Sequence, residues 1–311
     1  MIQQYAHRPV LLNEVLAALA IQADGVYVDG TFGRGGHAAA ILDELGPKGR
    51  LFAMDKDPEA VQSAREQFGG DPRFEIQQGA FTMLSRAVAQ RQLQGQVNGL
   101  LLDLGVSSPQ LDDASRGFSF SLDGPLDMRM DPAAGVSAAE WLQTASEKNI
   151  RGVLKTFGEE RFAKRIAHAI VEQRGREPLR TTGQLAGLIA DAVPVHEQGR
   201  HPATRSFQAI RIHINRELDD IREVLQQSPD VLAPGGRLAV ISFHSLEDRI
   251  VKRFIRDEYR GEQPPAEFPL AGMDYQPRLR PVGKAIRAGE AEVQDNPRAR
   301  SAVLRVAERL Q

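Results

Sequence analysis

Short apolar runs alternate with amphipathic stretches over the first hundred residues of the chain, and the alternation returns near its end. Residues at helical spacing predict helices such as 36–45, 57–67 and 81–91. Strands are predicted at 26–29, 51–55, 73–77, 97–103, 236–242 and 301–307. This alternation is typical of βαβ units, so we predict an α/β fold built on a parallel sheet.

The alternation stops after 97–103, and residues from about 112 to 216 are mostly helices and loops. Two capping-box patterns, Thr144-x-x-Glu147 and Thr181-x-x-Gln184, precede apolar stripes there. A longer helix is predicted to begin near Pro202 and to carry its stripe as far as Leu225. We therefore predict one domain from 1–110 and 216–311, with an inserted all-helical domain over 111–215.

The first predicted strand runs into a loop with four glycines in seven residues and then into a helix. Gly33, Gly35, Gly36 and His37 form the end of this loop. Glycines let the backbone turn sharply and approach a ligand, and the free N–H groups of the helix start can bind it. Asp55 ends the next strand, nineteen residues after Gly36, where a carboxylate can accept hydrogen bonds from ribose. Both NAD and S-adenosylmethionine carry that ribose.

Composition narrows the class of protein. The chain of 311 residues has no cysteine, which excludes disulfides, Cys-ligated zinc and a thiolate nucleophile and fits a cytoplasmic location. It shows neither a signal-peptide pattern nor a run of 18 apolar residues, so no membrane association is expected. The formal net charge is −2, yet residues 145–216 hold 13 Lys and Arg against 7 Asp and Glu. This basic segment indicates either a surface for nucleic-acid phosphates or an ordinary solvated helical face.

Ligands of open α/β sheets bind beyond the carboxyl ends of the strands. The candidate ligand-binding residues are therefore 33–37, Asp55, 78–81, 103–110 and 243–248. Asp103 could accept a hydrogen bond from a cofactor or a substrate amine, or it could cap a turn. Phe81 could lie on an adenine face or pack into the core.

Several long blocks of unusual sequence carry a resemblance that spans nearly the whole chain. They are HRPVLL from His7, DGTFGRGGH from Asp29, LLDLGVSSPQLD from Leu101, RGFSF from Arg116, GPLDMRMD from Gly124, HPATRSFQAIRI from His201, ISFHSLEDRIVK from Ile241 and NPRARS from Asn296. With these blocks the chain resembles the bacterial RsmH family, also called MraW. The resemblance implies a class I, Rossmann-like S-adenosylmethionine methyltransferase with a helical insertion. It also implies that the substrate is N4 of a cytidine in the decoding region of 16S rRNA, within the small ribosomal subunit.

The family's cofactor roles carry over onto matching positions of this sequence. The resemblance implies that Gly35, Gly36 and His37 line the methionine end, that Asp55 holds the ribose and that Phe81 lies on the adenine side. Gly33 is also counted among the cofactor-binding residues. Asp103 and Gln110 would complete the pocket. No metal is implied, and the sequence carries no prediction of oligomeric state.

Methyl transfer to cytosine N4 requires alignment of a weakly nucleophilic amine and an acceptor for its protons. Many amino-methyltransferases use a [D/N/S]-P-P-[aromatic] loop for this, but the chain has Ser107-Ser108-Pro109-Gln110 after its fourth strand. Asp103 and Ser108 are our candidate acceptors. Candidate stacking residues are Phe118, Phe120 and Phe243. His244 lies where a base could reach, although a structural role beside Ser245-x-x-Asp248, a possible capping box, is the alternative.

For contact with RNA we favour basic residues of the insertion and of two other segments. They are Arg129, Lys164, Arg165, Arg205, Arg211, Lys252, Arg298 and Arg300. Two other classes of protein stay open at this point: an NAD-dependent dehydrogenase, and an RNA-binding assembly factor without catalytic activity.

Overall fold

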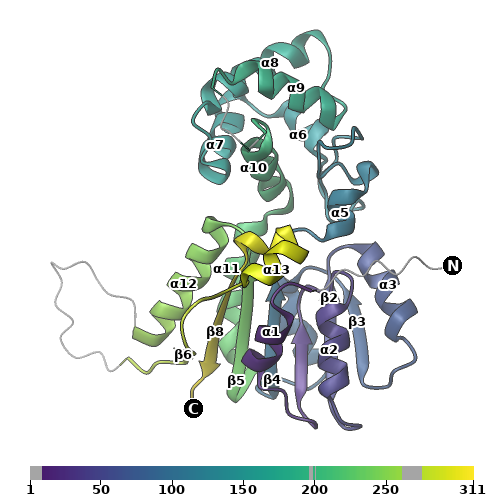
Figure 1. Ribbon diagram of the computed structural model, residues 1–311, viewed down its shortest axis with the longest axis vertical. Helices are drawn as coiled ribbons and strands as arrows, with labels where there is room; N and C mark the ends of the chain where they lie inside the picture. The colour runs from purple at the N-terminus through teal and green to yellow at the C-terminus, as the bar shows by residue number, and fades with distance from the viewer. Residues whose placement is uncertain (1–8, 196–198, 200, 261–274) are drawn as a thin grey trace. The chain divides into compact units, whose positions relative to one another are not determined.

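The computed structural model describes residues 9–195, 199, 201–260 and 275–311 (Figure 1). His7 and Arg8 of the first sequence block lie outside these ranges. The chain forms two compact units: the first contains Met1–Gly105 and Leu218–Gln311, and the second contains Val106–Glu217. Among the described helices, none is both long and apolar enough to cross a membrane.

The first unit is built on one sheet with the strand order β3-β2-β1-β4-β5-β8-β6. Its strands are β1 (Val26–Asp29), β2 (Arg50–Asp55), β3 (Phe74–Gln78), β4 (Val97–Asp103), β5 (Leu232–Ser242), β6 (Leu279–Pro281), β7 (Ile286–Arg287) and β8 (Val303–Arg309). Strands β1 to β5 pair in parallel, whereas β8 is antiparallel to β5, β6 and β7. The order reverses between β1 and β4, as in doubly wound folds, and the predicted α/β fold is confirmed.

Helices cover both faces of this sheet (Figure 1). They are α1 (Leu12–Leu19), α2 (Gly36–Glu44), α3 (Pro58–Phe68), the short η1 (Phe81–Met83), α4 (Leu84–Gln90), α11 (Glu217–Val231), α12 (Ser245–Arg260), α13 (Glu290–Asp295) and η3 (Pro297–Ser301). Leu19 and Ile41 of α1 and α2 share a buried core with Leu304 and Val306. The intervening Arg305 points to the opposite face, where its guanidinium binds Asp248 of α12 at 2.6 Å.

The second unit is helical. It contains α5 (Ser108–Asp112), η2 (Ala114–Arg116), α6 (Ala138–Thr144), α7 (Glu147–Gly158), α8 (Ala163–Arg176), α9 (Thr182–Ala192) and α10 (Thr204–Asn215). Ile150, Ile166, Leu185 and Ile210, one from each of the four longest helices, are fully buried in its core. A single β-bridge between Pro125 and Thr181 is the only strand pairing among its described residues.

Of the four helix caps and helix bounds discussed in the sequence, the structure confirms one and contradicts three. Thr181 and Gln184 form the predicted capping box of α9. Thr144 instead ends α6, and the Ser146 hydroxyl caps α7 by accepting from the Asn149 amide at 3.2 Å. The long helix from Pro202 is broken, because Arg216 adopts a φ of +55° between α10 and α11. Ser245-x-x-Asp248 is not the cap of α12, since Glu247 accepts from the amides before that helix and Asp248 binds Arg305.

Arg211 forms a nearly buried ion pair with Glu217 in the second unit. Its Nε and Nη2 donate to the two carboxylate oxygens at 2.8 Å each, and the side chains are 15% and 7% exposed. Removing one member of such a pair leaves the other charge buried without a partner, which destabilises the fold. Replacing both members with apolar groups of similar volume is often tolerated.

We expect Arg211→Ala to lower the free energy of unfolding by about 3 kcal/mol, because the Glu217 carboxylate is left without its partner. The double variant Arg211→Met/Glu217→Leu should recover most of this loss. Urea denaturation measures both, with the exposed Lys164→Ala as a control expected within about 0.5 kcal/mol of the wild type. A single variant as stable as that control would show that the ion pair does not stabilise the unit.

Candidate functional site

Three neighbouring strands of the first unit, β2, β1 and β4, all end in an aspartate at the same edge of the sheet. Asp29 pairs in register with Ala53 on one side and Leu101 on the other. Asp55 and Asp103 therefore extend two residues beyond it. We call this group of three strand-end carboxyls the aspartate recess; Asp29 is the most buried of the three, and the group is the candidate site.

Asp29 is 1% exposed and only partly satisfied. Its Oδ1 accepts from the Thr31 amide at 3.0 Å, whereas Oδ2 is buried with no hydrogen-bond partner in the described part of the chain. Burial raises the pKa of this carboxyl to about 7, and the nearby charge of Asp55 adds to the effect. A buried acceptor without a donor is a place where a ligand can supply one.

Asp55 is held firmly by the loop that follows β1. Its Oδ2 accepts from the Gly33 amide and its Oδ1 from the Asp57 amide, both at 2.8 Å. Burial raises its pKa to about 6, against the lowering effect of these two amides. Each carboxylate oxygen has a second lone pair, so the group can still accept hydrogen bonds from a diol.

The glycine loop requires its glycines for two different reasons. Gly35 adopts a φ of +79°, and a Cβ there would lie 2.6 Å from the ring of Phe32. At Gly36 a Cβ would lie 2.3 Å from Cγ of Pro9. Gly35 is the N-cap of α2 and offers no side-chain cap, so the first amides of this helix have no intrahelical acceptor.

Asp103 connects the recess to His37 and Thr31. The Asp103 amide donates to the Thr31 hydroxyl at 2.6 Å, and His37 Nε2 lies 3.7 Å from Asp103 Oδ2. Burial, followed by the charges of Asp29 and Glu247, raises the pKa of Asp103 to about 8, although 27% of its side chain is exposed. Burial lowers the pKa of His37 to about 4. At neutral pH the histidine is neutral and Asp103 largely protonated, so the two are not an ion pair.

Glu247, which the sequence did not single out, is fully buried behind Asp103. Its Oε2 accepts from the amides of Phe243 and His244 at 2.8 and 3.2 Å. The ring of His244 turns back onto this glutamate, with Nε2 3.2 Å from Glu247 Oε1 and Nδ1 accepting from the Glu247 amide at 3.4 Å. These contacts favour a structural role for His244.

The aromatic residues predicted to stack on the adenine or on the target base come from both units. Phe81 begins η1 and is partly exposed, and its Cβ lies 3.4 Å from where a Cβ on Gly30 would be. Phe243 is partly buried, with its ring 3.7 Å from the corresponding position of Gly105. Both therefore flank the strand ends of the first unit. Phe118 and Phe120 belong to the second unit, where Phe118 is buried and Phe120 packs on Phe207 at 4.8 Å.

Ser108 and Gln110 also belong to the second unit. Gln110 is buried, and its Oε1 accepts from the Ser107 amide at 2.9 Å at the start of α5. Their assigned roles as amine acceptor and cofactor ligand stay predictions.

The candidate RNA contacts fall into three groups: ion-paired, exposed and partly buried. Arg129 and Arg211 are each held in a two-pronged ion pair, with Asp127 and Glu217 respectively. The side chains of Lys164, Arg165, Lys252 and Arg300 are exposed, and those of Arg205 and Arg298 are partly buried. The exposed group is the better placed to reach phosphates, and all eight roles stay predictions.

Sequence reasoning missed Asp29, Thr31 and Glu247. Asp29 carries the signal that singled out Asp55 and Asp103, an acid ending an apolar strand, and could have been found by it. Glu247 could not, because its burial depends on how α12 packs on the sheet.

Asp29 generates a testable dependence of stability on pH. Its pKa in the folded protein, about 7, lies above the ordinary value of 3.8, so the folded state retains a proton that the unfolded chain releases. Relative to Asp29→Asn, the wild type should lose on the order of 2–4 kcal/mol of unfolding free energy between pH 4 and 7. Urea denaturation at intervals of one pH value measures this difference. Parallel curves for the two proteins would contradict the assignment.

The amino-acid sequence of the chain is similar to sequences of known proteins. The family model described as "MraW methylase family" matches residues 4–310. The chain is 61% identical over 306 residues to the protein named "Ribosomal RNA small subunit methyltransferase H" of Thioalkalivibrio sulfidiphilus, and the match covers 98% of each chain.

Solved structures give only distant matches. An rRNA methylase from Streptococcus thermophilus superposes with a TM-score of 0.42 at 12% identity, covering 100% of this chain and 99% of that one. An S-adenosylmethionine-dependent O-methyltransferase from Thermotoga maritima gives a TM-score of 0.41 at 10% identity, covering 96% and 64%. The sequence matches span nearly the whole chain and confirm the resemblance of its sequence blocks: this protein belongs to the MraW methylase family.

Proposed function

We propose that the protein transfers a methyl group from S-adenosylmethionine to N4 of a cytidine in the decoding region of 16S rRNA, within the small ribosomal subunit. The name of the 61% identical relative supports the substrate class, and family membership supports methyl transfer over hydride transfer or a purely structural role. The proposal depends on the aspartate recess, where buried carboxylate oxygens without a hydrogen-bond donor among the described residues lie beside the glycine loop.

The residues of the recess fit the cofactor. When bound, S-adenosylmethionine supplies an activated methyl group on a sulfonium. The unpartnered Oδ2 of Asp29 and the ring nitrogens of His37 would hold its amino-acid end, and Asp55 would accept from the two ribose hydroxyls. Phe81 would cover the adenine. Gly35 and Gly36 leave the backbone open to close approach.

Cytosine N4 is a weak nucleophile, because its lone pair is delocalised into the ring. The protein has to align the amine and to accept a hydrogen bond from its protons as positive charge develops on nitrogen. Asp103 Oδ1 suits this role, since it is buried and has no hydrogen-bond partner among the described residues. Methylation at carbon 5 would instead use a cysteine adduct at carbon 6, and the chain has no cysteine.

The proposed substrate places the protein in the cytoplasm with the ribosomal subunits. The second unit would contact the RNA through exposed cations such as Lys164 and Arg165 of α8. Target identity would come from the pocket and from RNA shape, with the cytosine turned out of any stack before reaction.

Small subunits from cells lacking the protein test the proposal directly. With S-adenosylmethionine labelled in its methyl group, the purified protein should transfer label to 16S rRNA, and nuclease digestion with mass spectrometry should place it on N4 of one cytidine. Label on carbon 5, on another base or on ribosomal protein would overturn the assignment, and oxidation of NADH by the same preparation would revive the dehydrogenase alternative.

The role of Asp103 predicts a pH profile. Because its pKa is raised to about 8, the carboxylate that accepts from the amine is scarce at pH 6, so kcat/KM should rise with pH and level off above about 8. Asp103→Asn should lower the plateau by at least about a hundredfold and remove the rise. The exposed Asp24→Asn serves as the control. Label uptake by Asp103→Asn equal to that of the control at every pH would refute the role.

A further inference from the structure

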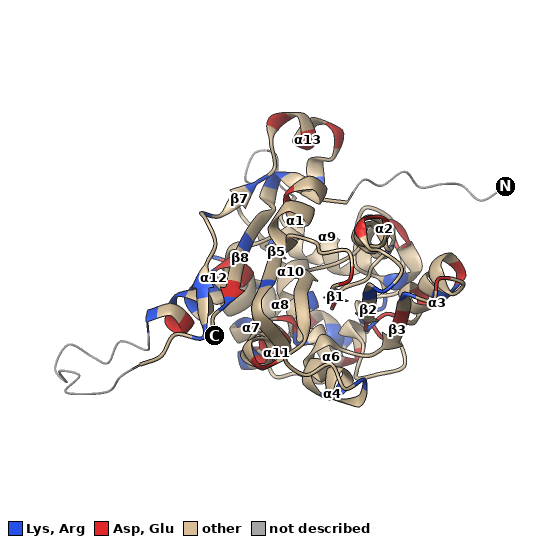
Figure 2. Ribbon diagram, turned by 90° about the horizontal axis from the view of Figure 1, so that it is seen from below, with Lys and Arg blue, Asp and Glu red and all other residues tan. Residues whose placement is uncertain are grey.

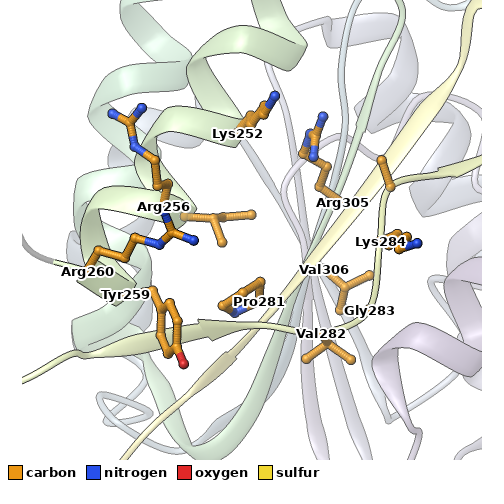
Figure 3. Close-up of a pocket in the computed structure, with 12 residues that line it drawn as sticks. Lys252, Arg256, Tyr259, Arg260, Pro281, Val282, Gly283, Lys284, Arg305 and Val306 are labelled. Carbon is orange, nitrogen blue, oxygen red and sulfur yellow. The ribbon is translucent and has the colours of Figure 1, made fainter.

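A basic groove of about 330 Å³ lies in the first unit, between α12, the turn after β6 and strand β8 (Figure 3). We call it the α12 groove and define it by its polar and aromatic lining residues, which are Lys252, Arg256, Tyr259, Arg260, Lys284 and Arg305. Figure 2 shows blue, basic positions gathered along α12 and the neighbouring β8. None of the residues placed in the aspartate recess lines it, so it is a separate feature.

The α12 groove is lined by five cations and by no carboxylate. Two of the cations are neutralised from outside the lining, Arg256 by Asp257 and Arg305 by Asp248, at 2.6 Å in each case. For Lys252, Arg260 and Lys284 the described residues provide no ion pair. Among the described residues, the groove thus presents about three positive charges that no carboxylate neutralises, and its concave surface concentrates their positive potential.

The spacing of the cations matches a chain of anions better than a single one. Lys252, Arg256 and Arg260 follow each other at four-residue intervals on one face of α12, so successive positions rise by about 6 Å along the helix. This rise is comparable with the spacing of successive phosphates along an extended nucleic-acid strand. Lys284 lines the opposite side of the groove, after β6 (Figure 3).

The ring of Tyr259 adds a second kind of contact. It is 45% exposed although it is large and aromatic, and it stands at the rim of the groove beside Arg260. Aromatic rings beside cations are typical of surfaces that bind single-stranded nucleic acid, because every base offers a face for stacking. An acidic protein segment would use the cations but would gain little from this ring.

The register of the sheet places the groove near the aspartate recess. Arg305 pairs with Val240, and Asp103 pairs with the next residue of β5, Ile241. The backbones of β4 and β8 are two strand spacings apart, or about 10 Å. Arg305 points to the α12 face of the sheet, whereas Asp103 pairs with Ile241, which belongs to the core on the other face. A strand of RNA in the groove would therefore reach the recess around the carboxyl end of β5.

We infer that the α12 groove binds the phosphates of a single-stranded stretch of the substrate rRNA next to the target nucleotide, with one base stacked on Tyr259. This inference rests on the proposed function, because it takes rRNA to be the substrate. It adds a binding surface in the first unit to the contacts proposed for the second.

Salt-dependent binding tests the inference. The variant Lys252→Ala/Arg260→Ala/Lys284→Ala removes only exposed side chains, and Lys48→Ala/Arg50→Ala/Arg86→Ala is matched to it in charge and exposure. Affinity for unmethylated small subunits is measured between 50 and 300 mM salt. Relative to the control, the groove variant should bind at least tenfold more weakly at 0.15 M salt, and the slope of log K against log salt should fall by about 2. The affinity of both variants for S-adenosylhomocysteine should equal that of the wild type.

Failure of the inference and failure of the proposed function give different results. If the wild type methylates 16S rRNA and the two triple variants bind it equally, the groove is not an RNA site and the proposed function stands. If the wild type transfers no methyl group to rRNA, the proposed function fails whatever the groove binds. A groove variant that loses affinity for polyglutamate but not for rRNA would mark a site for an acidic protein, and displacement of rRNA by millimolar inorganic phosphate alone would mark a site for a free anion. Either outcome overturns the inference.

Tyr259 provides an independent check. Tyr259→Ala should weaken rRNA binding by at least fivefold without changing the salt slope, since stacking is lost but no charge is removed. Tyr259→Phe keeps the ring and should bind like the wild type. Equal affinities of the two variants would contradict the stacking contact.

Discussion

The burial of three aspartates at the ends of three adjacent parallel strands constrains the rest of this structure. Carboxylates removed from water are costly unless donors or opposite charges surround them, and here the charge of Asp55 raises the pKa of Asp29 and that of Asp29 raises the pKa of Asp103. The protein compensates with backbone amides rather than with cations: Gly33 and Asp57 donate to Asp55, and Thr31 donates to Asp29. The donors that are still missing define what a ligand must bring.

This arrangement explains the unusual loop after β1. The amides of Thr31 and Gly33 have to reach two different strand ends within three residues, and the positive φ angles of Gly33 and Gly35 allow that path. Thr31 also joins the loop to β4 through the Asp103 amide. A loop fixed at both ends in this way is formed before a ligand arrives, which reduces the entropy lost on binding.

The positive charges of the chain divide into those paired with carboxylates and those exposed on helix surfaces. Several arginine side chains of this nearly neutral chain form ion pairs with carboxylates of their own unit. In the second unit, Arg129 pairs with Asp127 and Arg211 with Glu217. Such pairs stabilise a fold and offer little to an RNA phosphate. The cations left for recognition are those on solvent-facing helix surfaces, including α8 and α12. Total charge therefore says less about an RNA-binding protein than the share of its cations that lack a carboxylate.

The sequence by itself determined the α/β class, six of the eight strands of the sheet, the glycine loop and two of the three strand-end aspartates. It could do so because strand periodicity, glycine turns and acids at strand ends are local patterns that the backbone has to obey. The sequence also determined the family, through blocks such as Asp29–His37 that are long and unusual.

Only the tertiary structure decided the rest. It broke the predicted helix at Arg216, moved the cap of α7 from Thr144 to Ser146, turned Arg211 into an ion-pair partner and buried Glu247 behind Asp103. Each of these outcomes depends on which of several possible partners or caps a residue meets in the folded unit, as with Thr144 and Ser146, two nearby residues of similar propensity. Local patterns do not encode which partner wins, because packing and desolvation are settled when the whole unit folds.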